Sequence, residues 1–303
     1  MKFTKYTALN TSSAIDYLRE KLNFFDAGTK LSCEEIGDGN LNFVYRVMDE
    51  TTRRSVIIKQ AGAYARATPE YKLTTDRSRI EAEILKYQNK LAKGFVPEVY
   101  LYDEAMCCCI MEDLRDYKIL RNELINFCIY PQFARQISEF LADTLIRTSD
   151  ICMDSAEKKE NVRKFLNPEL CKISEDLVFT DPYTNAGRTN DVFLPNDRYV
   201  QENIYENMPL RLEAAKLSLQ FKSSAQSLIH GDLHSGSVFV KENSTKIFDP
   251  EFAFYGPAGY DLGNIIGNLL FAWTAAKVSN TEISDKKPFL TWIEQAIVDI
   301  VDI

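Results

Sequence analysis

The hydrophobic pattern changes its period partway along the chain, and this change limits what the chain can fold into. From residue 31 to residue 60, three runs rich in β-branched and aromatic residues are separated by a glycine turn and a polar turn, which predicts an antiparallel meander. Residues 74–92 carry apolar residues three and four apart behind a capping signal at Thr74 to Asp76, which predicts a helix. One helix therefore follows three strands.

Two more strand-like runs, at 95–103 and 106–114, complete the N-terminal pattern. They predict a small lobe over residues 1–114, built from a five-stranded antiparallel sheet with one main helix and joined to the rest of the chain at about 111–114. Residues 115–303 predict a larger, mostly helical lobe. The fold class is therefore α+β with two lobes.

The helical lobe contains one break in its period. Apolar residues three and four apart predict helices within 131–150, 209–228 and 260–277, whereas residues 237–249 alternate around a turn and predict a hairpin. The polar stretch 181–207 has neither period, and we expect a mobile insert there. The loop "LIHGDLHSGSVF", which holds both histidines of the chain, thus lies between a helix and a hairpin.

Composition argues against several classes of protein. The chain has no apolar run long enough to span a membrane, and its N-terminus lacks the charged-then-apolar build of a signal peptide, so we expect a cytoplasmic protein with no membrane partner. The net charge of −8 argues against a nucleic-acid partner, because phosphate contacts need clustered Lys and Arg. Seven cysteines without paired spacing, three of them at 107–109 in a strand-like run, indicate buried reduced thiols.

Phosphoryl transfer from ATP makes several demands on a protein. It needs backbone amides over the phosphates, a lysine on the third strand, a helix glutamate that aims the lysine, an aspartate at the reacting hydroxyl and an acid that binds metal. The chain offers candidates in this order: the turn Gly37-Asp38-Gly39-Asn40, Lys59, Glu81 or Glu83, Asp232, and Asp249 with Glu251. Their order predicts a kinase that uses ATP and Mg²⁺.

Each candidate taken alone has a simpler explanation. The glycine turn can be an ordinary hairpin, Lys59 can reach solvent from a strand end, and Glu81 can face solvent from its helix. Asp232 can cap a helix or brace a loop. The combination, in a fixed order on suitable elements, is what favours phosphoryl transfer.

Several motifs make the chain resemble a known family, the kinase-like small-molecule phosphotransferases, and among them the S-methyl-5-thioribose kinases. "HGDLH" is shared widely with choline and aminoglycoside kinases, whereas "GDGNLNFV" and "DPEFAFYGP" are more specific. The resemblance covers most of residues 30–268 and implies a two-lobed protein-kinase-like fold. It also implies phosphorylation of the 1-hydroxyl of 5-methylthioribose with ATP, a step of methionine salvage. The other matching motifs are "IIKQA", "LTTDRSRIE", "MEDL", "NPELC" and "LVFTDPY".

The kinase interpretation gives roles to the acids of the second lobe. Asp232 is expected to accept the proton of the substrate hydroxyl as this attacks the γ-phosphoryl group. A protein kinase has Asn five residues after this Asp, where this chain has Ser237. We expect Glu251 to replace that Asn, because an extended "DPE" would let Asp249 and Glu251 bind one Mg²⁺ from the same face.

The histidines receive a structural interpretation. His230 is expected to hydrogen-bond backbone and hold the loop, and His234 to orient or flank Asp232. A zinc site at the two histidines is the alternative, which Gly231 disfavours because it interrupts any helix between them. Asp261 resembles the acid that braces the catalytic loop from below in this fold.

The remaining contacts concern the nucleotide and the substrate. We expect adenine to pair with backbone groups of Glu112 and Leu114, where the strands give way to helices. The substrate pocket is expected to include Asp232 and Tyr71, which stands where family members usually carry Trp. An apolar wall for the methylthio group and polar partners for the sugar complete the expectation.

The resemblance also implies a longer chain. Family members continue beyond the position of Ile303, in a segment that includes paired arginines thought to touch the sugar. A helix that ends near residue 303 is expected to leave an apolar face without a partner. The shorter chain has three candidate explanations: an incomplete sequence, a second subunit that replaces the missing helices as in a homodimer, or loss of catalysis. That face comprises Trp292, Ile293, Ile297 and Val301.

Two alternative functions stay open. A kinase of the same fold for an aminoglycoside, choline or homoserine is one, and the acids of residues 181–207 would suit a cationic substrate. An inactive nucleotide-binding protein is the other, which the retention of Lys59, Asp232, Asp249 and Glu251 disfavours.

Overall fold

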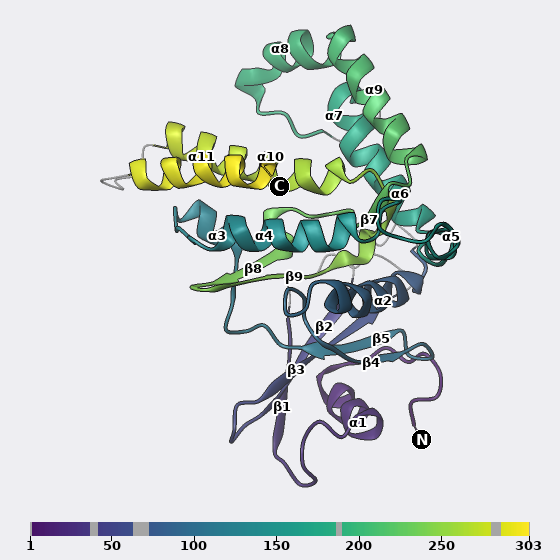
Figure 1. The fold of residues 1–303 in the computed structure, drawn as a ribbon. Helices are drawn as coiled ribbons and strands as arrows, with labels where there is room; N and C mark the ends of the chain where they lie inside the picture. The colour runs from purple at the N-terminus through teal and green to yellow at the C-terminus, as the bar shows by residue number, and fades with distance from the viewer. Residues whose placement is uncertain (1, 37–41, 63–72, 186–189, 280–285, 303) are drawn as a thin grey trace.

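An antiparallel sheet of five strands, in the order β1-β2-β3-β5-β4, forms the N-terminal part of the protein (Figure 1). It is seen in a computed structural model that describes residues 2–36, 42–62, 73–185, 190–279 and 286–302. The prediction of five antiparallel strands is confirmed. The strands are β1 (Leu31–Glu35), β2 (Asn42–Asp49), β3 (Ser55–Ala61), β4 (Val99–Asp103) and β5 (Cys108–Glu112).

A helix that the sequence reading missed, α1 (Thr11–Lys21), packs on β1 and β2. The Asn10 side chain caps it by accepting hydrogen bonds from the backbone of Ser12 and Ser13, and the Ser13 hydroxyl accepts one from the Asn10 backbone. Its buried Tyr17 and Leu18 join a core cluster with one face of the sheet. The local signal was present, because Asn10 precedes apolar residues at helical spacing.

The predicted helix of the first lobe is confirmed as α2 (Asp76–Leu91), which lies between the sheet and the helical part of the molecule (Figure 1). Thr75 precedes the helix but its side chain makes no capping hydrogen bond, so the expected capping signal was wrong. The backbone oxygen of Thr74 instead accepts a hydrogen bond from Arg77. The helix α2 therefore begins without a side-chain cap, and its buried face packs on β3, β4 and β5.

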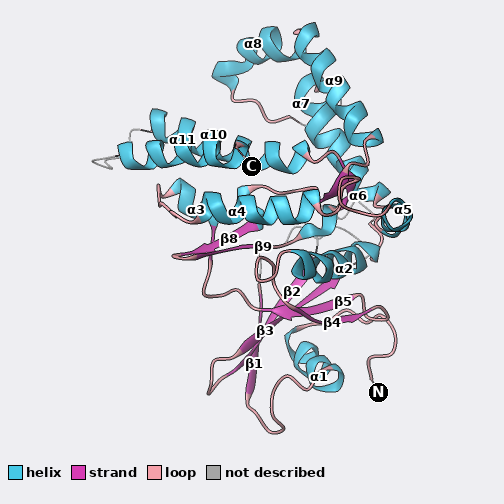
Figure 2. Cartoon of the chain, viewed as in Figure 1, coloured by secondary structure: helices cyan, strands magenta, loops and turns pink. Residues whose placement is uncertain are grey.

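The rest of the chain is mostly helical, with short strands beneath the helices (Figure 2). Two small sheets, β6-β8-β9 and β10-β7, lie beside the loop that holds the histidines. The predicted hairpin is confirmed as β8 and β9. These strands are β6 (Lys118–Ile119), β7 (Ser227–Ile229), β8 (Val238–Lys241), β9 (Ser244–Ile247) and β10 (Phe254–Gly256), and the longer helices are α3 (Leu120–Ile125), α4 (Phe133–Leu141), α5 (Ser155–Lys164), α6 (Pro168–Ser174), α9 (Met208–Ser223), α10 (Gly259–Val278) and α11 (Lys287–Val301).

One hydrophobic core joins the two parts of the molecule. It contains Leu85 of α2 and Met111 of β5 together with Phe140 of α4 and Ile293 of α11. Hydrogen bonds also cross between the parts, because the Ile247 amide donates to the Phe95 carbonyl oxygen at 2.7 Å. The division into lobes near residue 114 stays a prediction.

Three local predictions need correction. Cys107 does not belong to the strand, because it occupies the turn before β5 with φ +50°, and only Cys108 and Cys109 are buried in the sheet. The stretch 181–207, in which no helical period was expected, contains short helices, α7 (Asp181–Thr184) and α8 (Asp197–Val200), in its described residues, and its mobility stays a prediction. The helix expected within 209–228 ends at Ser223, because β7 pairs with β10 from Ser227 onwards.

Most of the expected apolar face of α11 has partners, so the expectation of an uncovered face was wrong for Trp292, Ile293 and Ile297, whereas Val301 is 58% exposed. Phe289, Ile293, Ala296 and Ile300 are buried against α4 and α10, and the Trp292 ring lies 6.4 Å from that of Phe133. Earlier helices of the chain therefore cover this face up to Val301. Among the described helices, none is long and apolar enough to cross a membrane.

Candidate active site

Alternation along β3 decides which way Lys59 points. Val56 and Ile58 belong to the core cluster on the α1 side of the sheet, whereas Ile57 packs against the cluster on the α2 side. Successive side chains of a strand point to opposite faces, so Lys59, two residues after Ile57, also faces α2. The strand pattern thus directs a lysine into the space between the sheet and the helical lobe.

In that space Lys59 meets two carboxylates. Its Nζ donates to Glu81 Oε1 of α2 at 2.8 Å and also contacts Asp249 Oδ1. Glu83, the alternative partner that the sequence left open, instead pairs with Arg79 at 3.0 Å and with Lys164 at 3.4 Å. The structure therefore brings Lys59 together with Glu81 and not with Glu83.

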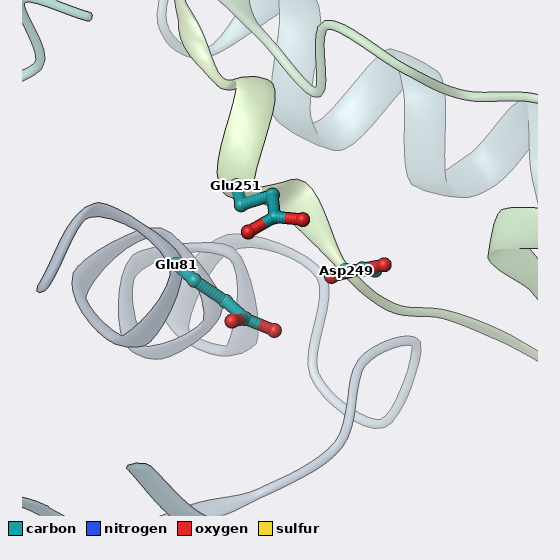
Figure 3. Close-up of side chains that lie close together, drawn as sticks. All are labelled: Glu81, Asp249 and Glu251. Carbon is teal, nitrogen blue, oxygen red and sulfur yellow. The ribbon is translucent and has the colours of Figure 1, made fainter. Parts of the chain in front are cut away.

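Figure 3 shows Glu81, Asp249 and Glu251 with their carboxylates gathered between α2 and the segment that follows β9. One oxygen of each lies within 4.8 Å of the others, the only such group of metal-ligating side chains found in the described part of the chain. Carboxylate oxygens are the ligands that hard divalent cations prefer, so the donor set fits Mg²⁺ or Ca²⁺. Neither histidine belongs to this group, which leaves the zinc alternative without support among the described residues.

Burial and the shared ammonium have opposite effects on the pKa of each of these acids. Burial acts to lower the pKa of Lys59, but Asp249, Glu81 and Glu251 hold it well above its usual range. Burial raises the pKa of Glu81, an effect that Lys59 opposes. Partial burial acts to raise the pKa of Asp249, but Lys59 lowers it overall. The cluster carries more acid than base, which favours an additional cation.

The "DPE" segment is not extended, contrary to expectation. Asp249 adopts left-handed backbone angles, with φ +66° and ψ 44°, and Pro250–Phe252 form one 3₁₀ turn, η6. Left-handed backbone is uncommon for a residue other than glycine and is found often at functional sites. The turn still directs Asp249 and Glu251 to the same cluster. The prediction that these two side chains converge is therefore confirmed, whereas the predicted extended backbone was wrong.

The loop of residues 230–237 places Asp232 at its bend. The Asp261 carboxylate of α10 accepts hydrogen bonds from the His230 amide at 2.6 Å and from the Gly231 amide at 3.0 Å, which agrees with the expected bracing role. Gly231 has φ +80°, and a Cβ there would lie 2.2 Å from the Phe252 carbonyl oxygen, so only glycine fits. The loop thereby packs directly against the segment that carries the metal-binding candidates.

The histidines hold this loop. His230 Nε2 donates to the Phe248 carbonyl oxygen at 3.0 Å, and its Nδ1 accepts the Asp232 amide at 3.3 Å, which confirms its expected backbone contacts. His234 Nδ1 accepts the Gly236 amide at 2.9 Å. The proton of His234 is therefore on Nε2, which lies 3.4 Å from Asp232 Oδ2. His234 flanks Asp232, as expected.

The connection between the lobes has part of its backbone already paired. The Glu112 amide donates to the Glu98 carbonyl oxygen at 2.8 Å, and the Leu114 carbonyl oxygen accepts from the Tyr117 amide at 2.9 Å. The Glu112 side chain accepts a hydrogen bond from Lys246 of β9 at 2.6 Å. Any pairing of adenine with these two residues would thus use the Glu112 carbonyl group and the Leu114 amide.

Four predicted site residues lie outside the described residues: Gly37, Gly39, Asn40 and Tyr71. Three residues that the sequence reading did not single out contact the acid cluster instead. Asn42, Arg77 and Asn167 each contact Glu251 or its immediate surroundings. All three stand within the matching motifs, which was the available signal.

Comparisons with known proteins agree with this geometry. Residues 32–282 match the model of a phosphotransferase enzyme family. A methylthioribose kinase from a Geobacillus species is 46% identical over 268 residues, which cover 88% of this chain and 66% of the relative. A methylthioribose kinase from Pectobacterium atrosepticum is 43% identical over 267 residues, 88% of this chain and 66% of the relative. The chain thus spans about two thirds of the length of these relatives.

A solved structure shows a similar fold. The choline kinase from Cryptosporidium parvum aligns over 86% of this chain and 69% of its own, with a TM-score of 0.51 and 16% sequence identity. At this identity the likeness concerns the fold alone. It supports the expectation of a two-lobed, kinase-like architecture.

Proposed function

The chain belongs to the phosphotransferase enzyme family, and from this premise we propose that it is an ATP-dependent kinase acting on the 1-hydroxyl of 5-methylthioribose in methionine salvage. The substrate is proposed from the relatives named methylthioribose kinase, at 41–46% identity. The single observation that carries the reaction type is the cluster of Lys59, Glu81, Asp249 and Glu251, packed against the loop that presents Asp232.

The acid cluster supports a site for Mg²⁺ with the nucleotide phosphates. Asp249 and Glu251 are the proposed ligands, and their oxygens lie close enough to share one ion. When bound, Mg²⁺ would neutralise charge on the phosphate oxygens. Glu81 holds the Lys59 ammonium at 2.8 Å, so that Lys59 is oriented to contact the phosphates.

Asp232 is the proposed acceptor of the substrate proton. Its side chain is 43% exposed, so a substrate hydroxyl can reach it, and His234 Nε2 lies 3.4 Å from its Oδ2. His234 thus flanks one carboxylate oxygen of Asp232, and the other oxygen is proposed to accept the proton. The main chain of Gly37, Gly39 and Asn40 is proposed to cover the phosphates, and Tyr71 to line the sugar pocket.

The proposal is tested with purified protein, ATP, Mg²⁺ and a panel of acceptors. We expect ADP release to depend on 5-methylthioribose, with phosphate recovered on its 1-hydroxyl. Equal or faster turnover with choline, homoserine or an aminoglycoside would replace the proposed substrate but keep the reaction type. Binding of Mg-ATP without turnover of any acceptor would favour a nucleotide-binding protein instead.

A further inference from the structure

Three buried side chains that take no part in the proposed chemistry converge on Glu251. We propose that Asn42, Arg77 and Asn167 are positioning residues that fix the Glu251 carboxylate for a divalent cation. The inference rests on the proposed function, since it concerns the metal site of that reaction. Each of the three comes from a different element, and each is at least about nine-tenths buried.

Asn42, the first residue of β2, bridges a cation and an anion. Its Nδ2 donates to Glu251 Oε2 at 2.8 Å, and its Oδ1 accepts from Arg77 Nε at 3.1 Å. The reverse orientation of the amide would face its NH₂ toward the guanidinium and its oxygen toward the carboxylate. The two charged neighbours therefore fix the amide in one orientation, and the amide fixes the carboxylate.

Arg77, in the first turn of α2, is itself held by the backbone. Its Nη1 donates to the Thr74 carbonyl oxygen at 2.7 Å and its Nη2 to the Gly62 carbonyl oxygen at 2.9 Å. Its Nε lies 3.7 Å from Glu251 Oε2. Arg77 stands one helical turn before Glu81, so the same face of α2 positions the partner of Lys59 and the support of Glu251.

Asn167, which precedes α6, holds the main chain of the metal segment. Its Nδ2 donates to the Glu251 carbonyl oxygen at 2.8 Å and to the Ala253 carbonyl oxygen at 3.2 Å. These contacts span the 3₁₀ turn that carries Glu251. The backbone and the side chain of Glu251 are thus fixed from different elements.

The pattern of contacts leaves one oxygen of Glu251 for a ligand. Asn42 and Arg77 both engage Oε2, and no hydrogen bond to Oε1 is found among the described residues. If Glu251 served only the fold, an apolar residue at its position would be more favourable for folding, because removing the charge of a carboxylate from water is unfavourable. Supports of this kind around metal-binding residues typically change metal affinity by about 10–100-fold when removed.

The experiment measures Mn²⁺ binding by electron paramagnetic resonance, with a non-hydrolysable ATP analogue present, in single and double variants. Asn42→Ala, Arg77→Lys and Asn167→Ala should each weaken Mn²⁺ binding by about tenfold or more. Arg79→Met is the matched control, because Arg79 lies on the same helix but pairs with Asp76 and Glu83. It should bind Mn²⁺ as the unaltered protein does. Far-UV circular dichroism without metal shows whether each variant is folded.

A double variant separates positioning from a general structural effect. In the Glu251→Gln background, Asn42→Ala should cause little further loss of Mn²⁺ affinity, because Asn42 acts through Glu251. Asn42→Asp has nearly the size of Asn but turns the donor into a repelling carboxylate. It should weaken Mn²⁺ binding even if Asn42→Ala does not fold.

Two results would overturn the inference in distinguishable ways. In the first, Glu251→Gln weakens Mn²⁺ binding, but the Asn42, Arg77 and Asn167 variants either bind Mn²⁺ normally or lose affinity in addition to the loss caused by Glu251→Gln. The positioning role is then wrong, and the proposed metal site stands. If Glu251→Gln itself binds Mn²⁺ normally, the metal role of Glu251 is wrong, and the inference with it.

Discussion

At the scale of single residues, the site acids differ in exposure and in partners. The side chains of Asp232 and Asp249 are 43% and 39% exposed, whereas those of Glu81 and Glu251 are 2% and 6% exposed. Asp249 contacts the Lys59 ammonium, and no contact of Asp232 with a lysine or arginine is found among the described residues. The contact with Lys59, rather than exposure, therefore separates Asp249 from the proposed proton acceptor.

Replacing Asp232 tests its proposed role as proton acceptor. We expect Asp232→Asn to lower kcat by at least about 100-fold, because an amide cannot accept the hydroxyl proton. The affinity for ATP should stay unchanged, since the nucleotide contacts are assigned to other residues. Steady-state kinetics and calorimetric titration with ATP check both statements. An unchanged kcat would exclude the role of Asp232.

Lys59→Met tests the ammonium within the acid cluster. Without Lys59, burial raises the pKa of Glu81 unopposed, so the folded state binds a proton more tightly than the unfolded state. A folded pKa above the unfolded value makes stability fall as pH rises through the interval between them. With Lys59 present the pKa of Glu81 is already raised to about 8, so the additional loss in free energy of unfolding should grow as the pH rises above about 8, as measured by urea unfolding at about pH 7 and about pH 9. A loss that is independent of pH would contradict this account.

At the scale of elements, α10 reaches the loop that presents Asp232. Asp261 is fully buried at the start of this helix and uses both carboxylate oxygens to accept the His230 and Gly231 amides. The helix and the loop are 30 and 31 positions apart in sequence at these contacts. The conformation of the loop is thus set by a helix that follows it.

Asp261→Asn tests this bracing. One of the two acceptors becomes an NH₂ group that faces an amide, so the free energy of unfolding should fall by about 1–3 kcal/mol. kcat should also fall, because Asp232 is no longer held at its position. Urea unfolding and steady-state assays measure the two effects. Asp299→Asn, at an exposed acid of α11, is the control and should change neither.

At the scale of the whole molecule, a continuous core links the sheet to the helical lobe. The cluster that contains Leu85 of α2 and Met111 of β5 extends through α4 and α10 to α11. The Lys246–Glu112 ion pair adds a largely buried polar contact across the same boundary, at 2.6 Å. The two lobes are expected to lose their structure together.

Thermal unfolding followed by two probes tests this expectation. Both tryptophans, Trp273 and Trp292, lie in α10 and α11, so their fluorescence reports the helical lobe, whereas far-UV circular dichroism reports the entire chain. The two signals should change with one midpoint, because a shared core makes unfolding cooperative. A second transition seen only by circular dichroism would show that the sheet unfolds separately.

The sequence by itself determined the five strands and the helix α2, and it predicted Lys59, Asp232, Asp249 and Glu251 as site residues. These features depend on the period of apolar residues and on the order of motifs, which are readable along the chain. The missed helix α1 and the misplaced capping signal show the limit of that reading, because competing local signals are close in energy. The roles of the site residues, including the phosphate turn and Tyr71, stay predictions.

Only the tertiary structure decided which glutamate meets Lys59, how "DPE" turns and which residues support Glu251. Glu81 and Glu83 are equivalent in sequence, but the packing of α2 directs only Glu81 toward β3. Asn42 and Glu251 are separated by 209 positions, and their contact depends on how the sheet sits against the helical lobe. Such contacts leave no local period in the sequence, since they arise from the packing of elements that are distant along the chain.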